Sequence, residues 1–318
     1  MRGIEIGTAQ EGQRLDKYLM KYLNEAPKGF IYKMLRKKNI KLNGTKATGN
    51  EILSDGDRLE IFLSDDTVDK FTSEKSVNLS AGGLDILYED ENIIAVNKDA
   101  GILTHAASPT DNDTMTHRLF KYLYEKDEVL ISRESVFTPA FCNRLDRNTS
   151  GIIIGGKTQD ALRQLSLAIR EKKIRRFYQA IVSGEIYDGD RLEGFYRKDN
   201  VSNTAYILEN AQTGDEKDVA LTYKPVITKN GHTLLEIELL TGRSHQIRAQ
   251  LSYMGNPILG DLKYGNTYNK FGLKRPMLHC SALVIDGVTD RLMYLNKKDI
   301  TARKPDDFLR CEKKVFNP

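Results

Sequence analysis

Two hydrophobic periods divide the chain into helical and extended segments. Leucines recur every fourth residue from Leu15 to Leu23, which predicts an amphipathic helix over residues 14–23. After Pro27, the apolar residues between Ile31 and Leu35 share one face of a second predicted helix, and most of the neighbouring lysines and arginines lie outside that face.

The following residues change to the two-residue period of β-strands. The segment Ile40–Gly44 alternates and ends in Asn-Gly, a strong signal for a type I′ hairpin, and Arg58–Leu63 is typical of a further strand. We therefore expect residues 1–63 to form a small α+β domain. Residues 64–83 are rich in Ser, Asp, Thr and Lys without sustained periodicity, so a flexible linker is expected there.

Strand and helix patterns also occur through residues 84–318. Apolar runs at 86–88 and 93–96 predict two strands joined by an acidic turn, and 235–239 alternates as a half-buried strand. Residues 159–172 carry apolar positions at helical spacing. These patterns indicate a second, larger domain that contains both strands and helices.

Composition and charge narrow the class of protein. With 318 residues, 40% of them hydrophobic and 29% charged, the chain is typical of a globular protein of about two domains. The three cysteines have neither the number nor the spacing of a disulfide framework or a zinc site, and no apolar run has the length of a membrane helix. We therefore expect a cytoplasmic protein.

The positive charge is concentrated at one end of the chain. Residues 1–63 contain 12 lysines and arginines against 8 aspartates and glutamates, whereas the remaining residues contain 36 of each. The whole net charge of +4 therefore lies in the predicted small domain. An uneven basic charge of this kind favours a surface that faces nucleic acid.

The stretch Arg144–Gly151, of sequence Arg-Leu-Asp-Arg-Asn-Thr-Ser-Gly, leads into three isoleucines that predict a buried strand. Asp146 lies between two arginines at the start of this strand. Flanking cations lower the pKa of an aspartate, and an ionised carboxylate can act as a nucleophile or a base. On charge alone, the simpler interpretation is a surface ion pair ahead of a core strand.

The overlapping stretch Gly151–Thr158 satisfies the pattern of a nucleotide-binding P-loop. A P-loop needs a pliable turn whose amides surround phosphate, and three consecutive isoleucines favour extended strand instead. We therefore expect no nucleotide site here, and we expect Thr158 to cap the helix that follows.

Residues 144–158 as a whole resemble the active-site motif of the RluA-type pseudouridine synthases, enzymes that isomerise uridine to pseudouridine in ribosomal or transfer RNA. Further stretches resemble the motifs of this family in the same order along the chain: Asn97–His105, Arg176-Phe177-Tyr178, Thr241–Arg248, Gly255–Asp261 and Leu278-His279-Cys280. In addition, residues 14–19 and 56–61 resemble the RNA-binding domain named after ribosomal protein S4.

The resemblance implies an α+β protein with three parts. An S4-like RNA-binding domain (1–63) is followed by the linker (64–83) and by a catalytic domain (84–318) built on a mixed, mainly antiparallel β-sheet with flanking helices. Two positions depart from the family pattern. Asp99 replaces a usual proline, and Asn143 replaces a usual histidine, so a role that needs a protonated histidine is in doubt there.

The resemblance also implies roles for individual residues. Asp146 is the expected catalytic carboxylate, Tyr178 stacks on the target base, and Arg243 forms the ion pair that holds Asp146. Arg144 occupies the space that a flipped-out uridine leaves. Further residues are expected to contact substrate or RNA: Arg14, Lys17, Lys33, Arg36, Lys37, Lys38, Ile247 and Arg248. For Arg248, bracing the site and contacting phosphate remain alternatives, and His105 is expected to be structural.

The implied reaction moves a glycosidic bond from N1 to C5 of one uracil, so no cofactor or metal is expected. Asp146 attacks or deprotonates the ribose, and the sequence does not separate these alternatives. We expect a monomer that acts on RNA, with large-subunit rRNA favoured over tRNA. Two other classes stay open: a non-catalytic RNA-binding or ribosome-assembly factor, and a glycoside hydrolase, for which a second carboxylate is missing.

Overall fold

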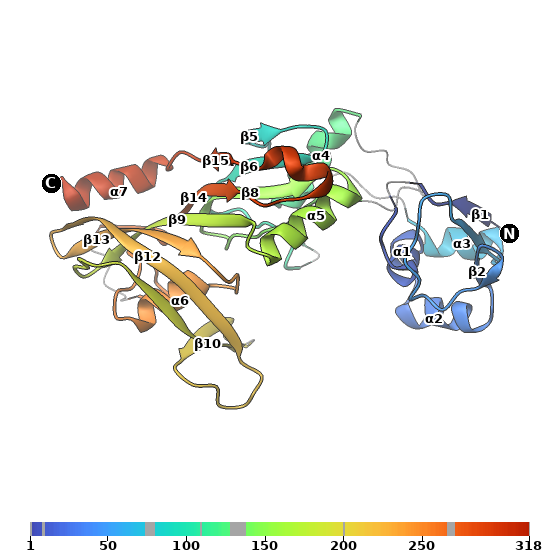
Figure 1. Ribbon diagram of the computed structural model, residues 1–318, viewed down its shortest axis with the longest axis horizontal. Coiled ribbons are helices and arrows are strands. Elements are labelled where there is room, and N and C mark those ends of the chain that lie inside the picture. The colour runs from blue at the N-terminus through green and yellow to red at the C-terminus, as the bar shows by residue number, and fades with distance from the viewer. Residues whose placement is uncertain are drawn as a thin grey trace.

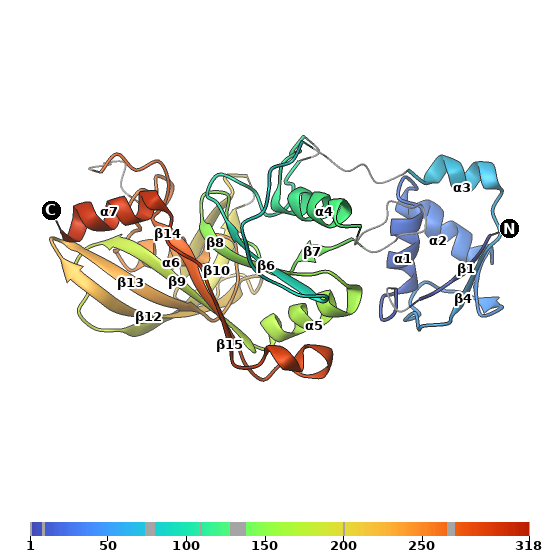
Figure 2. The same ribbon diagram turned by 90° about the horizontal axis from the view of Figure 1, so that it is seen from above.

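The strands form two separate sheets, each with its own hydrophobic core (Figure 1). The structure is a computed structural model and describes residues 2–7, 10–73, 80–108, 110–127, 138–199, 201–265 and 271–317. In both views the N-terminal unit lies apart from the larger sheet (Figures 1 and 2). Among the described residues, no helix is both long and apolar enough to span a bilayer.

The N-terminal unit is a small α+β structure, as its sequence predicts. Its sheet has the order β1-β4-β2-β3, and its elements are β1 (Arg2–Glu5), α1 (Leu15–Tyr22), α2 (Lys28–Arg36), β2 (Ile40–Leu42), β3 (Thr45–Lys46), β4 (Arg58–Ile61) and α3 (Asp65–Phe71). The predicted apolar faces of α1 and α2 are buried in one cluster. At the β2–β3 turn, Asn43 and Gly44 have φ angles of 51° and 75°, which confirms the type I′ turn.

Helix α3 lies within the stretch that we expected to be a flexible linker. Ser64 caps its first turn by accepting a hydrogen bond from Thr67 N–H at 3.3 Å. Val68 is fully buried and Phe71 packs against the N-terminal core, so the stretch is ordered by contacts that its polar composition concealed. Residues 74–79 of the expected linker lie outside the described residues.

The larger sheet has the order β11-β10-β12-β13-β9-β14-β8-β6-β5, with β15 paired to β14 and β7 paired to β8. Its strands are β5 (Ile86–Glu89), β6 (Ile93–Lys98), β7 (Ala140–Phe141), β8 (Ser150–Gly156), β9 (Ile174–Ser183), β10 (Asp190–Asp199), β11 (Thr204–Leu208), β12 (Lys217–Lys229), β13 (His232–Leu239), β14 (Leu278–Ile285) and β15 (Lys298–Thr301). Among the described strands only the β8–β14 pair is parallel, so the expected mixed, mainly antiparallel sheet is confirmed.

Helices flank the large sheet, as expected. They are α4 (Met115–Glu125), α5 (Gln159–Arg170), α6 (Gln246–Tyr253), the 3-10 helix η1 (Asp290–Leu295) and α7 (Asp306–Phe316). The C-terminal helix α7 lies at the end of the molecule away from the N-terminal unit and contacts β12 (Figure 2). Asp146 precedes β8 and Tyr178 lies on β9, and in the middle of the sheet β14 lies between these two strands.

Strand β8 contains the predicted isoleucine run, and all of its residues are buried. Gly151, at its start, has φ of 116°, and an added Cβ would overlap main-chain atoms of Cys280 on the parallel strand β14. Only glycine therefore permits this close approach. Thr158 Oγ1 accepts from Ala161 N–H at 3.1 Å and caps α5, which confirms the predicted cap. Residues 150–156 are extended strand, whereas a P-loop has a turn there.

Candidate active site

Asp146 lies in the loop that precedes β8, and main-chain contacts fix this loop. Thr149 N–H donates to the Asp146 carbonyl oxygen at 3.1 Å. Leu145 is buried, and Thr104 Oγ1 bonds both its carbonyl oxygen (3.1 Å) and its N–H (3.2 Å). Because Thr104 belongs to the stretch Asn97–His105, two motif-bearing segments are tied together beside Asp146.

A buried lysine strengthens the same connection. Lys98 has no exposed surface, and its Nζ donates to the carbonyl oxygens of Asp99 and Ile102 at 2.8 Å and of Arg147 at 3.1 Å. Burial lowers the pKa of Lys98 to about 7, and the negative charge of Asp146 opposes this shift. From the sequence, Lys98 was expected only to be part of the motif Asn97–His105.

The ion-pair partner of Asp146 is Arg248. Its Nη1 donates to Asp146 Oδ2 at 3.1 Å, while Nε and Nη2 donate to the two carboxylate oxygens of Asp261 at 2.6 and 2.9 Å. Burial lowers the pKa of Arg248, but the bonds to Asp261 and the charge of Asp146 outweigh it and raise the pKa above its ordinary value. One guanidinium thus bridges two carboxylates.

The expected pair between Arg243 and Asp146 is wrong. Arg243 is exposed and precedes α6, whereas Arg248 lies in the first half of α6, half-buried against Asp146. Between them the chain turns at His245, which has φ of 59°. Of the two alternatives left open for Arg248, the structure places it in the bracing position.

Among the described residues, neither arginine that flanks Asp146 in the sequence forms an ion pair with it. Arg147 is exposed and pairs with Asp111 at 3.7 Å. Arg144 is also exposed and lines the cavity described below. In the described part of the chain, Asp146 therefore pairs with a residue about a hundred positions away rather than with its neighbours.

His245 and Gln246 hold the chain between β13 and α6. His245 Nδ1 lies 2.9 Å from the Tyr264 hydroxyl and its Nε2 lies 3.9 Å from Asp146 Oδ2. Burial lowers the pKa of His245, although Asp146 opposes the shift, so the imidazole is neutral at pH 7. Gln246 Oε1 accepts from Arg243 N–H at 3.0 Å, which fixes the turn that presents Arg243.

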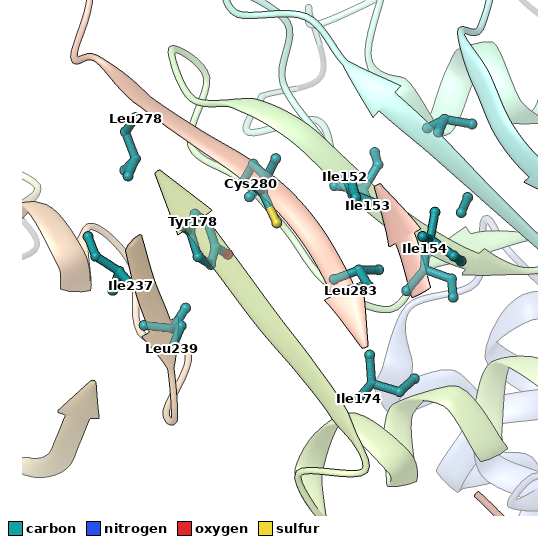
Figure 3. Packing of buried hydrophobic residues seen from close by; sticks show 14 of the residues in the cluster. Ile152, Ile153, Ile154, Ile174, Tyr178, Ile237, Leu239, Leu278, Cys280 and Leu283 are labelled. Atoms are coloured by element: carbon teal, nitrogen blue, oxygen red, sulfur yellow. The ribbon is translucent and has the colours of Figure 1, made fainter. Parts of the chain in front are cut away.

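Tyr178 is 4% exposed and lies on β9, beside Cys280 of the neighbouring strand β14 (Figure 3). Burial raises the pKa of Tyr178 well above its ordinary value, and the adjacent Cys280 thiol adds to the shift. The phenol therefore keeps its proton at all physiological pH values.

Asn143 has a structural role at the position where the family usually has histidine. Its Nδ2 donates to the Ile152 carbonyl oxygen at 3.1 Å and its Oδ1 accepts from Ile154 N–H at 2.8 Å. Both bonds go to the main chain of β8, so the amide supplies one donor and one acceptor without any need for titration. His105 lies outside the cavity and contacts Thr116 Oγ1 at 2.9 Å.

These elements enclose a cavity of about 520 Å³, a size typical of small-molecule sites. Six of the residues expected from the sequence line it: Arg144, Asp146, Tyr178, Arg243, Ile247 and Arg248. Ile247, 4% exposed, adds an apolar surface. The structure thus brings these six residues together from three distant stretches of the chain.

The cavity wall is strongly basic, beyond what the sequence indicated. Arg170, Lys172 and Arg176 also line it, and of these three only Arg176 was singled out from the sequence, as part of the motif Arg176-Phe177-Tyr178. Among the described lining residues, Asp146 is the only acidic one. The run of lysines and arginines at 172–176 was the available signal, and only the fold shows which of them face the cavity.

The N-terminal residues expected to contact RNA do not line the cavity. Lys17, Lys33, Arg36, Lys37 and Lys38 are exposed on the N-terminal unit. Arg14 is exposed as well, but its guanidinium bonds the Asp16 carboxylate at 2.9 and 3.1 Å and Asn50 Oδ1 at 2.8 Å. The structure leaves the RNA-binding role of these residues as a prediction.

The fold is that of the pseudouridylate synthases. A solved structure of human RNA pseudouridylate synthase domain containing 4 superimposes with a TM-score of 0.56 at 20% sequence identity, covering 73% of this chain and 92% of that one. A second human protein, RNA pseudouridylate synthase domain containing 1, gives a TM-score of 0.51 at 20% identity, covering 76% and 98%.

Sequence comparison gives the family. The family model described as RNA pseudouridylate synthase matches residues 92–253, about half of the chain. An uncharacterized RNA pseudouridine synthase of Mycoplasma genitalium is 31% identical over 86% of each chain, and ribosomal large subunit pseudouridine synthase C of Vibrio vulnificus is 28% identical over 87% of this chain and 86% of the other. The chain therefore belongs to the RNA pseudouridylate synthase family and is an isomerase that converts uridine to pseudouridine in RNA.

Proposed function

We propose that this enzyme isomerises specific uridines of large-subunit rRNA and that Asp146 is its catalytic carboxylate. The observation that carries the residue assignment is the pairing of Asp146 with Arg248, because it fixes the only acidic side chain among the described lining residues of a basic cavity. The relatives named ribosomal large subunit pseudouridine synthase C support the choice of RNA.

The reaction needs the target uridine outside its helix or loop, since a stacked base cannot reach a side chain at the floor of a cavity. Arg144 is proposed to fill the space that the base leaves, and its exposed position at the cavity wall supports this role. Within the cavity, the C1′–N1 bond breaks, C1′ rejoins the base at C5, the C5 proton leaves and N1 takes up a proton. Oxidation states and atoms balance without a co-reactant.

Asp146 starts this sequence by attacking or deprotonating the ribose, and both steps need an ionised carboxylate. Arg248 keeps it oriented, because Asp261 holds the guanidinium from the other side with two bonds. Such a fixed charge is preorganised and requires little rearrangement during the reaction. Tyr178 supplies an aromatic surface for the base, and its protonated hydroxyl can donate but cannot act as a base.

The N-terminal unit is proposed to be an S4-like RNA-binding domain. Its exposed cations on α2 and at the end of this helix, Lys33, Arg36, Lys37 and Lys38, support this assignment. The proposed site of action is the cytoplasm, in keeping with three free cysteines, and the proposed state is a monomer.

Tritium release tests the proposal. Large-subunit rRNA transcribed with 5-tritiated uridine is incubated with wild-type protein or with Asp146→Asn, a change that keeps the size of the side chain. We expect release from wild type alone, while both proteins bind the RNA equally. Turnover by Asp146→Asn would refute the role of Asp146. Release from tRNA but not from rRNA transcripts or assembled large subunits would refute the choice of substrate.

A further inference from the structure

The cavity wall contains an arginine, Arg176, that forms no ion pair with a carboxylate in the part of the chain that the structure describes. Among the described residues, the bond recorded for the Arg176 guanidinium runs from Nη2 to the Leu239 carbonyl oxygen at 3.3 Å, and Nε is buried without any partner. A guanidinium has five N–H donors, so this side chain is poorly satisfied. Burying such a group is costly unless a counter-ion completes it.

Three other arginines with little exposed side-chain surface, unlike Arg176, are each neutralised by a carboxylate. Arg118, Arg248 and Arg275 have side-chain exposures of 15%, 11% and 7%. Each of them donates two bonds of 2.6 to 2.9 Å to one carboxylate: Asp113, Asp261 and Asp307. The fold thus supplies a carboxylate at three comparable positions and not at Arg176.

The main chain near Arg176 leaves its guanidinium accessible from the cavity side. Gly242 lies opposite, and a Cβ added there would come within 2.9 Å of Arg176 Nη1. On β9, Arg176 and Tyr178 are two residues apart and therefore share a face of the sheet. Arg175 is next to Arg176 in the sequence and therefore lies on the other face. There Arg175 bonds Glu238 at 2.7 and 2.8 Å, so its charge is neutralised.

Two exposed cations complete a cluster. Arg170 at the end of α5 and Lys172 in the following turn line the same cavity as Arg176. The acid nearest in sequence, Glu171, pairs with Lys173 at 2.8 Å and does not line the cavity. Three cations of the cavity lining therefore come from the junction of α5 and β9, whereas Asp146, the only acidic side chain among the described lining residues, comes from the loop before β8.

We infer that Arg176, together with Arg170 and Lys172, binds a phosphate of the RNA backbone beside the flipped nucleotide. The planar fork of a guanidinium matches two oxygens of a phosphate diester, and the two exposed cations add charge to the same corner. Arg176 lies about 6.6 Å along the strand from Tyr178, so a group held there is adjacent to a base stacked on the phenol. This inference rests on the proposed function, since it assumes that Tyr178 receives the base.

Salt-dependent binding tests the site without requiring turnover. The probe is a fluorescent ten-nucleotide oligouridylate, and its affinity is measured between 50 and 300 mM KCl for wild type, Arg176→Gln and the matched control Arg175→Gln. Each lost phosphate contact lowers the slope of log K against log salt by about 0.7 for a single strand. We expect this decrease for Arg176→Gln and an unchanged slope for Arg175→Gln. Equal slopes for all three proteins would overturn the assignment.

A double variant guards against loss of folding. Arg170→Gln with Lys172→Gln changes exposed side chains only, so the fold is expected to survive and the slope is still expected to fall. A slope that stays at the wild-type value in this folded variant would remove both residues from the site.

Neutral backbone analogues separate a phosphate from the uracil as the ligand. Two RNA fragments that contain the target uridine are made, each with a neutral methylphosphonate in place of one of the two phosphates that flank this uridine. For one of the two fragments we expect wild type to bind about tenfold more weakly than it binds the unmodified RNA. For Arg176→Gln we expect the same fragment and the unmodified RNA to bind equally. If Arg176→Gln instead lowers kcat, with the wild-type sensitivity to both analogues retained, the guanidinium acts on the base and the phosphate site is refuted.

The two proposals fail in different ways. A wild-type protein that releases no tritium from large-subunit rRNA, yet shows the Arg176-dependent slope, would lose the proposed substrate and retain the phosphate site.

Discussion

A single guanidinium determines the arrangement of charge around Asp146. Arg248 bonds Asp146 with one nitrogen and Asp261 with two others, and the side chain of Asp261 is only 1% exposed. The family resemblance directed attention to Arg243, which belongs to the same motif but lies exposed before the turn. The two arginines therefore make different contributions to stability.

We predict that Arg248→Met destabilises the protein far more than Arg243→Gln. Losing Arg248 leaves the buried Asp261 carboxylate without its counter-ion, and breaking a buried pair in this way costs about 3–5 kcal/mol. Arg243 is exposed, so its replacement is expected to change the free energy of unfolding by less than about 0.5 kcal/mol. Urea unfolding measures both, and similar losses would contradict the assignment of the ion pair.

Lys98 predicts an unusual dependence of stability on pH. Its pKa is about 7 in the folded protein, mainly because of burial, against 10.5 as its ordinary value. Between these values the unfolded chain binds a proton that the folded chain has released, so the free energy of unfolding rises with pH by up to about 1.4 kcal/mol per pH unit. Below pH 7 both states are protonated and this contribution is constant.

The measurement is urea unfolding of wild type and Lys98→Met at several pH values from 6 to 9.5. The variant loses three hydrogen bonds and is less stable throughout, but its stability is expected to lack the rise above pH 7. Parallel curves for the two proteins would show that Lys98 stays charged in the folded state.

At the scale of elements, the parallel contact between β8 and β14 positions the Asp146 loop. His279 on β14 contacts Ser150 on β8 at 3.0 Å, and the next residue, Gly151, lies against the Cys280 main chain. Because Tyr178 on β9 pairs with Cys280 on the other side of β14, the three strands place Asp146 and Tyr178 at one cavity.

Gly151→Ala is predicted to destabilise the protein by about 3 kcal/mol or more. Its Cβ would overlap main-chain atoms that cannot move aside, at a φ that side chains rarely adopt. Gly29→Ala is the control: nothing lies within 4 Å of an added Cβ in α2, and alanine is expected to stabilise this helix by about 0.5–1 kcal/mol. Thermal unfolding distinguishes the two, and a tolerated Gly151→Ala would show that β8 and β14 can separate.

At the scale of the whole molecule, two basic surfaces are available to RNA: the cavity wall and the exposed face of α2. The cavity wall surrounds Asp146, the proposed catalytic residue. Helix α2 belongs to the N-terminal unit, which has its own hydrophobic core. We therefore expect the two surfaces to contribute separately, one to turnover and the other to affinity.

Charge removal from α2 tests this division. The double variant Arg36→Gln, Lys37→Gln is expected to lower the slope of log K against log salt by about 1.4 and to raise KM, with kcat unchanged at saturating RNA. The matched control changes Lys313 and Lys314, two exposed lysines of α7, to glutamine. Loss of affinity to the same extent in both would mean that net charge rather than the α2 surface binds RNA.

The sequence by itself determined the family and those elements that have a strong local pattern. Local patterns predicted helices α1 and α2, the Asn-Gly hairpin, the buried isoleucine strand and the cap at Thr158, because these depend on periodicity, turn conformation and short-range hydrogen bonds. The order of motifs gave the reaction and identified Asp146, Tyr178 and the residues near them.

Only the tertiary structure decided which charges meet. Arg248 rather than Arg243 pairs with Asp146, because the turn at His245 separates the two arginines and places Arg248 on α6. Arg176 rather than Arg175 lines the cavity, because successive residues of a strand lie on opposite faces. Helix α3 also depends on packing, because its two apolar residues Val68 and Phe71 pack against the core of the N-terminal unit, which is formed mainly by residues far from them in the sequence. Contacts between residues far apart in the chain follow from packing, which no local pattern records.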